Sequence, residues 1–220
     1  MNIENIVFIV VIIIILFLFY LYFKTYDTYK KISQKPECQK TLEDAKKLLD
    51  SINVKFHLHS GTALGAIREK DFIKHDHDID IAVFNYDYKD SVIETMKKKF
   101  IFLKKYGSVD NGLELKFVHK EKKINLDIFL IYKKENKFVQ SVYHCKSDRF
   151  EKGPNVDDEC IMYMNNYKPI LIEFLGKQYY CAPISFLVDR YGKDWMVPKI
   201  FNYFEGLDKN YSVVEKFKKE

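Results

Sequence analysis

The sequence has few glycines and prolines, which break helices and strands, and few cysteines, which can cross-link a chain. Its 220 residues include 8 Gly, 5 Pro and 4 Cys. So little Gly and Pro argues against long flexible linkers. No two cysteines form a CxxC pair, so the usual zinc-site spacing is missing. There is also no zinc-finger, helix-turn-helix or RNA-recognition signature, and the net charge of +5 is spread along the chain. We therefore expect no nucleic-acid partner.

The four cysteines leave two interpretations open. Unpaired cysteine is commonly buried, so we expect free buried thiols. The alternative is a zinc site or a disulfide, because His144 adjoins one cysteine and two more follow it. The cysteines are Cys38, Cys145, Cys160 and Cys181.

The residues that are abundant predict a folded domain. Hydrophobic residues make up 47% of the chain, aromatic residues 16% and charged residues 30%. This composition is typical of globular proteins, and the aromatic residues supply material for a core. The length suits one catalytic domain with a short appendage.

The appendage is an apolar run at the amino terminus. Ile6 to Phe23 carries no charge, and 18 residues at about 1.5 Å each approach the thickness of a bilayer core. Tyr20 and Tyr22 lie at one end, where aromatic residues mark membrane interfaces. We expect one transmembrane helix, with residues 1–35 forming an anchor and stem and residues 36–220 a catalytic domain.

A cleaved signal peptide is the alternative for this run. Such peptides begin with basic residues and end at a small-residue cleavage site. Here Glu4 precedes the run and no small residues follow it, so we favour a retained single-pass anchor. Its orientation stays open. Four downstream lysines favour a cytosolic domain, whereas the sequon Asn210-Tyr211-Ser212 favours a lumenal one. These lysines are Lys24, Lys30, Lys31 and Lys35.

Beyond Pro36 the hydrophobic pattern alternates between helical and strand periods. Leu42, Ala45 and Leu49 recur at helical spacing, whereas Val54, Phe56 and Leu58 alternate with polar residues as in a strand. After Ser147 the pattern is irregular until one last helix. The order predicts a mixed α/β or α+β domain with a small central sheet. The expected helices are 37–52, 63–68, 88–100 and 184–191, and the expected strands are 54–59, 79–84, 113–119 and 124–132.

Two acidic residues mark the strand expected at 79–84. Asp78 and Asp80 are two positions apart, so their side chains share one face, while Ile79 and its neighbours face the other way. Two close carboxylates repel each other, and a divalent cation between them removes that cost. Oxygen ligands favour Mg²⁺ or Mn²⁺. Since exposed acids at a strand end are also common, this motif alone is weak.

A third acid strengthens the interpretation. Asp127 interrupts an otherwise apolar strand, where an ionised carboxylate is costly unless it is paired or binds metal. We expect it to complete the metal site or to act as a general base. His75 and His77 are candidate ligands of a transition metal, but they alternate with the acids, so we expect them to face elsewhere or to shape the loop.

A glycine turn supplies the remaining part of the expected site. Ser60, Gly61 and Thr62 follow one strand and open a short helix. Glycine permits close backbone approach, and N–H groups at a helix start bind phosphate oxygens. Arg68 follows as a positive partner. We expect these residues to position phosphate, with Asp76 orienting the metal-binding acids.

These residues together resemble the LicD/fukutin family. The family pattern is a GG(S/T)xLGxxR turn, a short FIPWD-like link and a DxDxD strand, which residues 58–68, 71–73 and 75–81 match. Ser60 stands where the first glycine is usual, and Lys74-His75 where Pro-Trp is usual. Tyr191-Gly192-Lys193-Asp194-Trp195, followed by Pro198, is similar to a closing YGxxWxxP segment. The resemblance covers about residues 40 to 200.

The resemblance implies a nucleotidyltransferase-like fold and an activity. Its members transfer a phospho-alcohol, such as phosphocholine or ribitol phosphate, from a CDP-linked donor to a glycan or glycoconjugate hydroxyl. Eukaryotic members are commonly membrane proteins of the Golgi or ER, which implies that location here. We therefore expect an α+β fold with a mixed central sheet flanked by helices and preceded by the transmembrane helix. Two alternatives are a nucleotidyltransferase of other specificity and a non-catalytic scaffold with the same fold.

Overall fold

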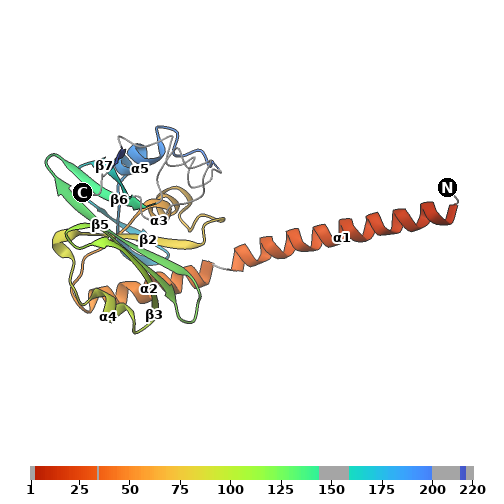
Figure 1. Cartoon of the computed structure of the whole chain (residues 1–220), viewed down its shortest axis with the longest axis horizontal. Helices are drawn as coiled ribbons and strands as arrows, with labels where there is room; N and C mark the ends of the chain where they lie inside the picture. Colours follow the sequence, from red (N-terminus) through yellow and green to blue (C-terminus); the bar gives the residue numbers. More distant parts are fainter. Residues whose placement is uncertain (1–2, 34, 144–158, 200–213, 217–220) are drawn as a thin grey trace.

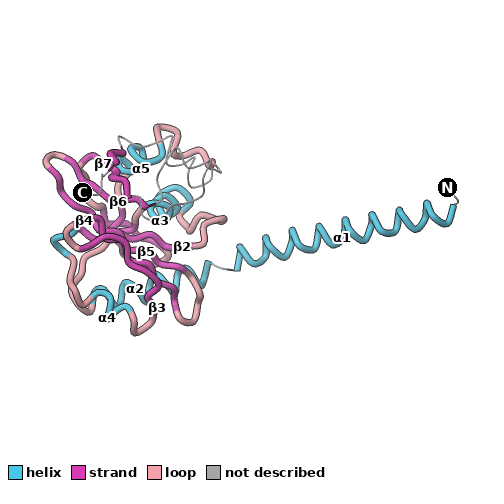
Figure 2. The backbone as a smooth tube through the Cα atoms, in the orientation of Figure 1, coloured by secondary structure: helices cyan, strands magenta, loops and turns pink. Residues whose placement is uncertain are grey.

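The computed structural model describes residues 3–33, 35–143, 159–199 and 214–216. Helix α1 (Ile3–Ser33) extends away from the remaining elements, which pack together around a sheet (Figure 1). Helix α2 (Lys35–Asp50) follows it and lies along that sheet. Figure 2 shows the strands gathered in the middle of the domain, with helices on both sides.

The sheet is mixed and has ten strands among the described residues. Its centre is β5 (Asn125–Lys134), which runs parallel to β2 (Asp78–Phe84) and antiparallel to β4 (Asn111–His119). Strands β1 (His57–Leu58), β9 (Lys177–Cys181) and β8 (Ile170–Phe174) continue beyond β2, and β3 (Phe100–Ser108) pairs with β4. The end of β5 pairs with β6 (Lys137–Tyr143), which leads to β7 (Glu159–Asn165) and β10 (Val214–Lys216).

The two central strands have one apolar face and one face that carries acids. Ile79, Ile81 and Val83 alternate along β2 and are fully buried. On β5, Leu126, Ile128 and Leu130 do the same, because side chains along a strand point alternately to opposite faces. Since Asp80 pairs with Asp127 in register, the opposite faces of both strands bring their acids together.

Helices cover both faces of this sheet. Helix α2 buries Leu42, Ala45 and Leu49, a stripe at helical spacing, and it lies on one side with α4 (Val92–Met96) (Figure 1). Helices α3 (Ser60–Leu64) and α5 (Ile184–Tyr191) lie on the other side. The acids therefore face the α3/α5 side.

A π-helical turn, η1 (Gly65–Glu69), extends α3. A Cβ on Gly65 would lie 2.7 Å from the Asp71 carbonyl oxygen and 3.1 Å from the Ile73 nitrogen, so glycine lets the following loop pack against this turn. Lys70 ends the turn in the left-handed region, with φ 57°. Insertions of this kind occur frequently at functional sites, and here the loop leads directly to the acids of β2.

The transmembrane helix predicted for residues 6–23 is a wrong prediction. Within the described part of the chain, no helix combines the length and the apolar character that crossing a membrane requires. Helix α1 has 31 residues, but it becomes polar from Lys24 onward, with further charges at Asp27, Lys30 and Lys31. The same finding contradicts the predicted single-pass membrane protein of the Golgi or ER, a location that the family resemblance implies.

Several other expected elements have different bounds. The strand expected at 54–59 is reduced to β1, and the helix expected at 88–100 to α4, since β3 already begins at Phe100. The helix expected at 63–68 begins earlier and becomes π-helical. The region after Ser147, expected to be irregular, contains β7, β8 and β9. The mixed α+β architecture and the last helix at Ile184–Tyr191 agree with the sequence interpretation.

Candidate metal centre

Three acids converge where β2 and β5 run side by side. Asp78, Asp80 and Asp127 each place one carboxylate oxygen so that the three oxygens lie within 4.8 Å of one another. Asp127 is 6% exposed, so it is buried, and the other two are half-buried. Parallel pairing of the strands sets this geometry, because Asp80 and Asp127 are register partners. The structure thus brings together the three acids expected from the sequence.

The acids raise one another's proton affinity. Burial, followed by the charges of Asp78, Asp76 and Asp127, holds the pKa of Asp80 well above its usual value. Burial also raises the pKa of Asp127, and the opposing effect of Lys116 does not cancel the shift. In both groups burial is the largest cause, and neighbouring acids add to it.

Asp76 lies beside the same cluster. Burial and a hydrogen bond with Asp78 raise the pKa of Asp76 to about 8. Its carboxylate lies directly over Gly61, where an added Cβ would be 2.4 Å from Asp76 Oδ2. Gly61 is therefore required for this approach, and Asp76 hydrogen-bonds Asp78. The orienting role of Asp76 stays a prediction.

The glycine turn binds the acids themselves. The Gly61 amide donates to Asp80 Oδ2 at 3.1 Å, and the Asp80 amide donates to Thr62 Oγ1 at 2.9 Å. Ser60 adopts a left-handed φ of 42°, uncommon for a residue with a side chain, and its buried Oγ has no hydrogen-bond partner. The turn thus fixes the Asp80 carboxylate, a role that the sequence did not predict. Phosphate binding by Ser60, Gly61 and Thr62 stays a prediction.

Arg68, expected near phosphate, holds the closing segment. Its Nη1 donates to the Trp195 carbonyl at 3.0 Å, and its Nε donates to Glu69 at 2.9 Å. Trp195 also packs against the core. The arginine of the turn motif and the tryptophan of the closing motif, far apart in sequence, therefore contact each other directly. A phosphate-binding role for Arg68 stays a prediction.

Sequence reasoning missed two residues on β4. Lys116 Nζ lies 2.8 Å from Asp127 Oδ2 and 3.3 Å from Glu114 Oε1. Burial raises the pKa of Glu114 to about 7, against the opposing effect of Lys116. The alternation of Glu114 and Lys116 along a strand was the available signal, since residues two apart share a face. Nothing in the sequence indicated which strand they would face.

Two buried histidines lie on the same side of the sheet. His59 Nε2 pairs with Gln140 Oε1 at 2.8 Å, and its ring packs 4.6 Å from that of Phe186. His57 Nε2 lies 3.0 Å from the Tyr167 hydroxyl. Burial lowers the pKa of His57 to about 3 and holds the pKa of His59 well below its usual value. Both rings are therefore neutral at physiological pH.

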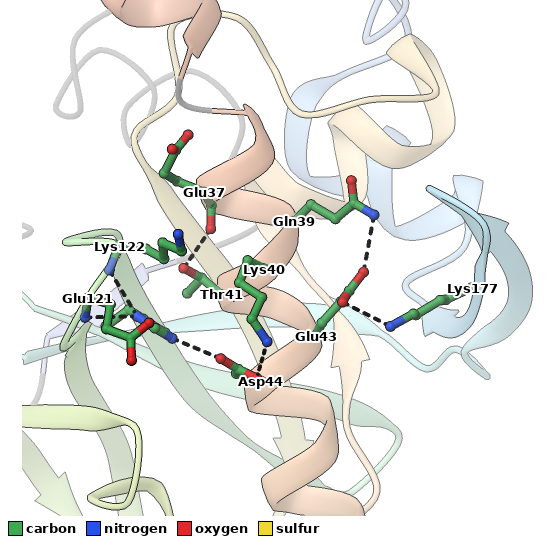
Figure 3. A network of polar contacts seen from close by, with 10 residues as sticks. Glu37, Gln39, Lys40, Thr41, Glu43, Asp44, Glu121, Lys122 and Lys177 are labelled. Carbon is green, nitrogen blue, oxygen red and sulfur yellow. Dashed lines mark hydrogen bonds and ion pairs between the residues drawn. The ribbon is translucent and has the colours of Figure 1, made fainter.

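The opposite side of the sheet carries a different polar network, centred on Asp44 of α2 (Figure 3). Lys40 Nζ lies 2.8 Å from Asp44 Oδ1, and His119 Nε2 lies 3.1 Å from Asp44 Oδ2. The amides of Glu121 and Lys122 donate to His119 Nδ1, which assigns the ring proton to Nε2. Burial acts to raise the pKa of Asp44, but Lys40 and His119 outweigh it and the pKa is lowered.

The donor set at the acid cluster fits a hard divalent ion. It consists of carboxylate oxygens alone among the described residues, without His75 or His77. Oxygen-only ligands match Mg²⁺ or Mn²⁺. A cation there would offset the mutual repulsion that raises the pKa of Asp80.

The cysteine alternatives are settled in part. Cys38 and Cys181 are free and buried, as the thiol interpretation predicted. Burial raises the pKa of Cys181 to about 12, so this thiol is unreactive. His144, Cys145 and the sequon Asn210-Tyr211-Ser212 lie outside the described residues.

Comparisons with known proteins agree on one family. A family model described as LicD/FKTN/FKRP, nucleotidyltransferase domain, matches residues 53–155. The human protein named Ribitol-5-phosphate transferase FKTN is 26% identical over 170 residues, which cover 76% of this chain and 35% of that protein. Its counterpart from Macaca fascicularis is 29% identical over 160 residues, 71% of this chain and 32% of that protein.

A nematode relative covers a similar share of the chain. Uncharacterized protein T07A5.1 of Caenorhabditis elegans is 32% identical over 168 residues, 72% of this chain and 42% of that protein. The chain spans about a third of the length of the fukutin proteins it matches. The matched family segment includes the glycine turn, the acids of β2 and Asp127.

Proposed function

We propose that this chain belongs to the LicD/FKTN/FKRP family, whose nucleotidyltransferase-domain model matches residues 53–155, and that it transfers a phospho-alcohol from a CDP-linked donor to a glycan hydroxyl. The names of its fukutin relatives support this proposal, since they are ribitol-5-phosphate transferases. The observation that carries it is the convergence of Asp78, Asp80 and Asp127 within 4.8 Å. Ribitol phosphate is the first donor group to test, and phosphocholine the second.

In the proposed reaction the acceptor hydroxyl oxygen attacks the phosphorus that bears the alcohol. A new oxygen–phosphorus bond forms, and the bond between that phosphorus and the bridging oxygen breaks. CMP leaves with the electron pair of the bridging oxygen, and the hydroxyl proton passes to a base. The products are the phosphodiester, CMP and one proton. Little covalent chemistry falls to the protein, so positioning and charge neutralisation dominate catalysis.

Each acid has a defined part in this proposal. Asp78, Asp80 and Asp127 would hold Mg²⁺ or Mn²⁺, which neutralises charge on the donor diphosphate when bound. Gly61 and Thr62 hold Asp80 in place through their contacts with its carboxylate and amide. Asp76 orients Asp78 through their hydrogen bond. As the alternative to completing the metal site, Asp127 is the candidate base for the hydroxyl proton, and burial raises its pKa above the usual value.

A donor screen tests the proposal. Purified protein is incubated with Mg²⁺, a glycan acceptor and CDP-ribitol, CDP-choline or CDP-glycerol, and CMP release is measured. We expect CMP release with one of these donors, its loss in the Asp78→Ala variant, and its loss on chelation. Unchanged turnover in the folded Asp78→Ala protein would overturn the assignment.

Product analysis separates the remaining alternative. A nucleotidyltransferase of other specificity would attach the nucleotide to the acceptor, so label in the cytidine of the donor would appear in the acceptor product. The proposed transferase leaves that label in CMP.

A further inference from the structure

A lysine on β4 connects the acid cluster to a fourth carboxylate. Lys116 and Glu114 are two residues apart on this strand, so their side chains share one face. That face is the one on which Asp127 lies, because Lys116 and Asp127 are register partners across the β4/β5 pair. The contact therefore follows from the strand pairing.

The ammonium of Lys116 lies between two buried carboxylates. It is 2.8 Å from Asp127 Oδ2 and 3.3 Å from Glu114 Oε1. The exposed fractions of the two acidic side chains are 9% for Asp127 and 8% for Glu114, whereas Lys116 is 36% exposed. A lysine ammonium has three donors, so two of them suffice for these acids and the third remains available on the exposed side.

Asp127 consequently belongs to two groups of atoms at once. One of its oxygens completes the grouping with Asp78 and Asp80, while Oδ2 binds Lys116. In two-metal phosphoryl-transfer sites the two cations lie about 3.5–4 Å apart and clamp the attacking and leaving oxygens. Here Asp127 lies between the acid grouping and Lys116, and Glu114 lies on the far side of Lys116, so a cation in the grouping would have the ammonium as its neighbour across Asp127.

We propose that the Lys116 ammonium takes the place of a second metal ion, so that the protein binds one divalent ion and supplies the other cation itself. Asp127 is then the shared carboxylate, and Glu114 holds Lys116 from the far side. Lys116 would then contact the anionic donor through its exposed side, while two of its donors bind Asp127 and Glu114. This inference rests on the proposed metal-dependent function.

A neighbouring lysine offers a matched control. Lys104 on β3 is the register partner of Lys116, and its ammonium lies 4.4 Å from the centre of the Tyr106 ring. Lys104→Met removes the same charge from the adjacent strand. Lys116→Arg keeps the charge, and the double variant Lys116→Met/Glu114→Gln removes the lysine together with the acid that it neutralises.

The test is the number of Mn²⁺ ions bound per chain, measured by titration of the full-length protein with Mn²⁺ alone and detection of free Mn²⁺ by electron paramagnetic resonance. We expect one ion for the wild type, for Lys104→Met and for Lys116→Arg. In Lys116→Met, Asp127 and Glu114 lose the ammonium that pairs with them, so this variant should bind a second ion. The double variant should return to one.

If Lys116→Met is poorly folded without metal, its melting temperature with and without Mn²⁺ provides a second test. Its melting temperature should then rise more on addition of Mn²⁺ than that of the wild type. In activity assays Lys116→Met should lose at least 10-fold in kcat and regain part of it at high Mn²⁺, whereas a merely structural lysine would show no such rescue.

The outcomes distinguish this inference from the proposed function. Two Mn²⁺ ions in the wild type, or one in Lys116→Met with no larger thermal shift, would overturn the role of Lys116 and leave the metal site standing. No Mn²⁺ binding by the folded wild type would overturn the metal-dependent function and the inference together.

Discussion

Two acid clusters lie on opposite sides of the same sheet, one around the buried Asp44 and one around the half-buried Asp76 and Asp80, and they differ in the charges beside them. On the α2 side, Asp44 is held by both Lys40 and His119, and its pKa is lowered. On the α3 side, Asp76 and Asp80 adjoin further acids, and their pKa values are raised. Acids that are neutralised within the chain serve the fold. The acids on the α3 side adjoin one another, and we propose that a cation from outside binds there.

The largest effect on this difference between the two clusters is expected from a substitution of Asp80. Asp80→Asn removes one like charge from the cluster, so we expect metal-free protein to unfold at a higher denaturant concentration than the wild type. Activity should fall by at least about 10³-fold, since transition-state charge loses its metal support. Kinetics and urea unfolding on the same preparation check both. A variant that loses stability and keeps activity would show that Asp80 serves the fold.

On the α2 side, a substitution of His119 should affect stability more than activity. His119→Phe leaves one Asp44 oxygen and two backbone amides without their partner, which should cost about 3 kcal/mol of unfolding free energy. The value of kcat should change little. The control is Lys46→Met. It removes the exposed Lys46–Asp50 pair on α2, the helix that carries Asp44, and should cost less than about 0.5 kcal/mol of unfolding free energy.

On the α3 side, the buried His57 should make the free energy of unfolding depend on pH. The pKa of His57 is lowered to about 3 by burial, so between about pH 6.5 and 3 the unfolded chain takes up a proton that the folded chain refuses. Stability therefore falls as pH falls through this window, by about 2 kcal/mol at pH 5. His57→Phe should remove this component. Equal pH dependence of stability in the variant and the wild type, measured by urea unfolding at several pH values, would show that the ring takes up its proton equally in the folded and unfolded chains and would contradict this prediction.

A smaller effect should follow from Gly61→Ala. The new Cβ would lie 2.4 Å from Asp76 Oδ2 and displace that flexible carboxylate from Asp78. Because alanine also favours the helix, the unfolding free energy should stay within about 1 kcal/mol of the wild type. Activity should fall by about 10-fold. If Asp76→Ala loses as much activity and the double variant loses no more, the two residues act together, whereas additive losses would contradict this.

The sequence was most informative where local pattern and tertiary contact agree. Strand β2 is predicted from Ile79, Ile81 and Val83, and β5 from an apolar run that one acid, Asp127, interrupts. In the structure the isoleucines and the valine of β2 and Leu126, Ile128 and Leu130 of β5 are fully buried. The convergence of the three acids followed from those strands being neighbours. Helix α5 was predicted from its apolar spacing and the proline before it.

The elements that sequence reasoning missed depend on distant pairing. Strand β3 exposes most of its residues and is held by β4, so its own pattern carries little signal. Strands β7, β8 and β9 likewise become regular only through their partners. The apolar run at the amino terminus was read as a membrane span, but α1 continues into the charged residues after Phe23, and no described helix meets the requirements for crossing a membrane.

Within the site, the sequence identified acids better than their partners. A carboxylate in an apolar strand, such as Asp127, is conspicuous on its own. The Lys116 contact depends on which strand lies beside β5, and the Arg68 contact with Trp195 joins residues 127 positions apart. Both require the fold, because a long basic side chain can reach many partners from one sequence position.

The central claim is that the acids of the α3 side form a cation site. Calorimetric titration of Mg²⁺ into the wild type and into Asp78→Asn/Asp80→Asn measures it most directly. We predict a saturable isotherm for the wild type and none for the folded double variant. Indistinguishable isotherms from the two proteins would contradict the account.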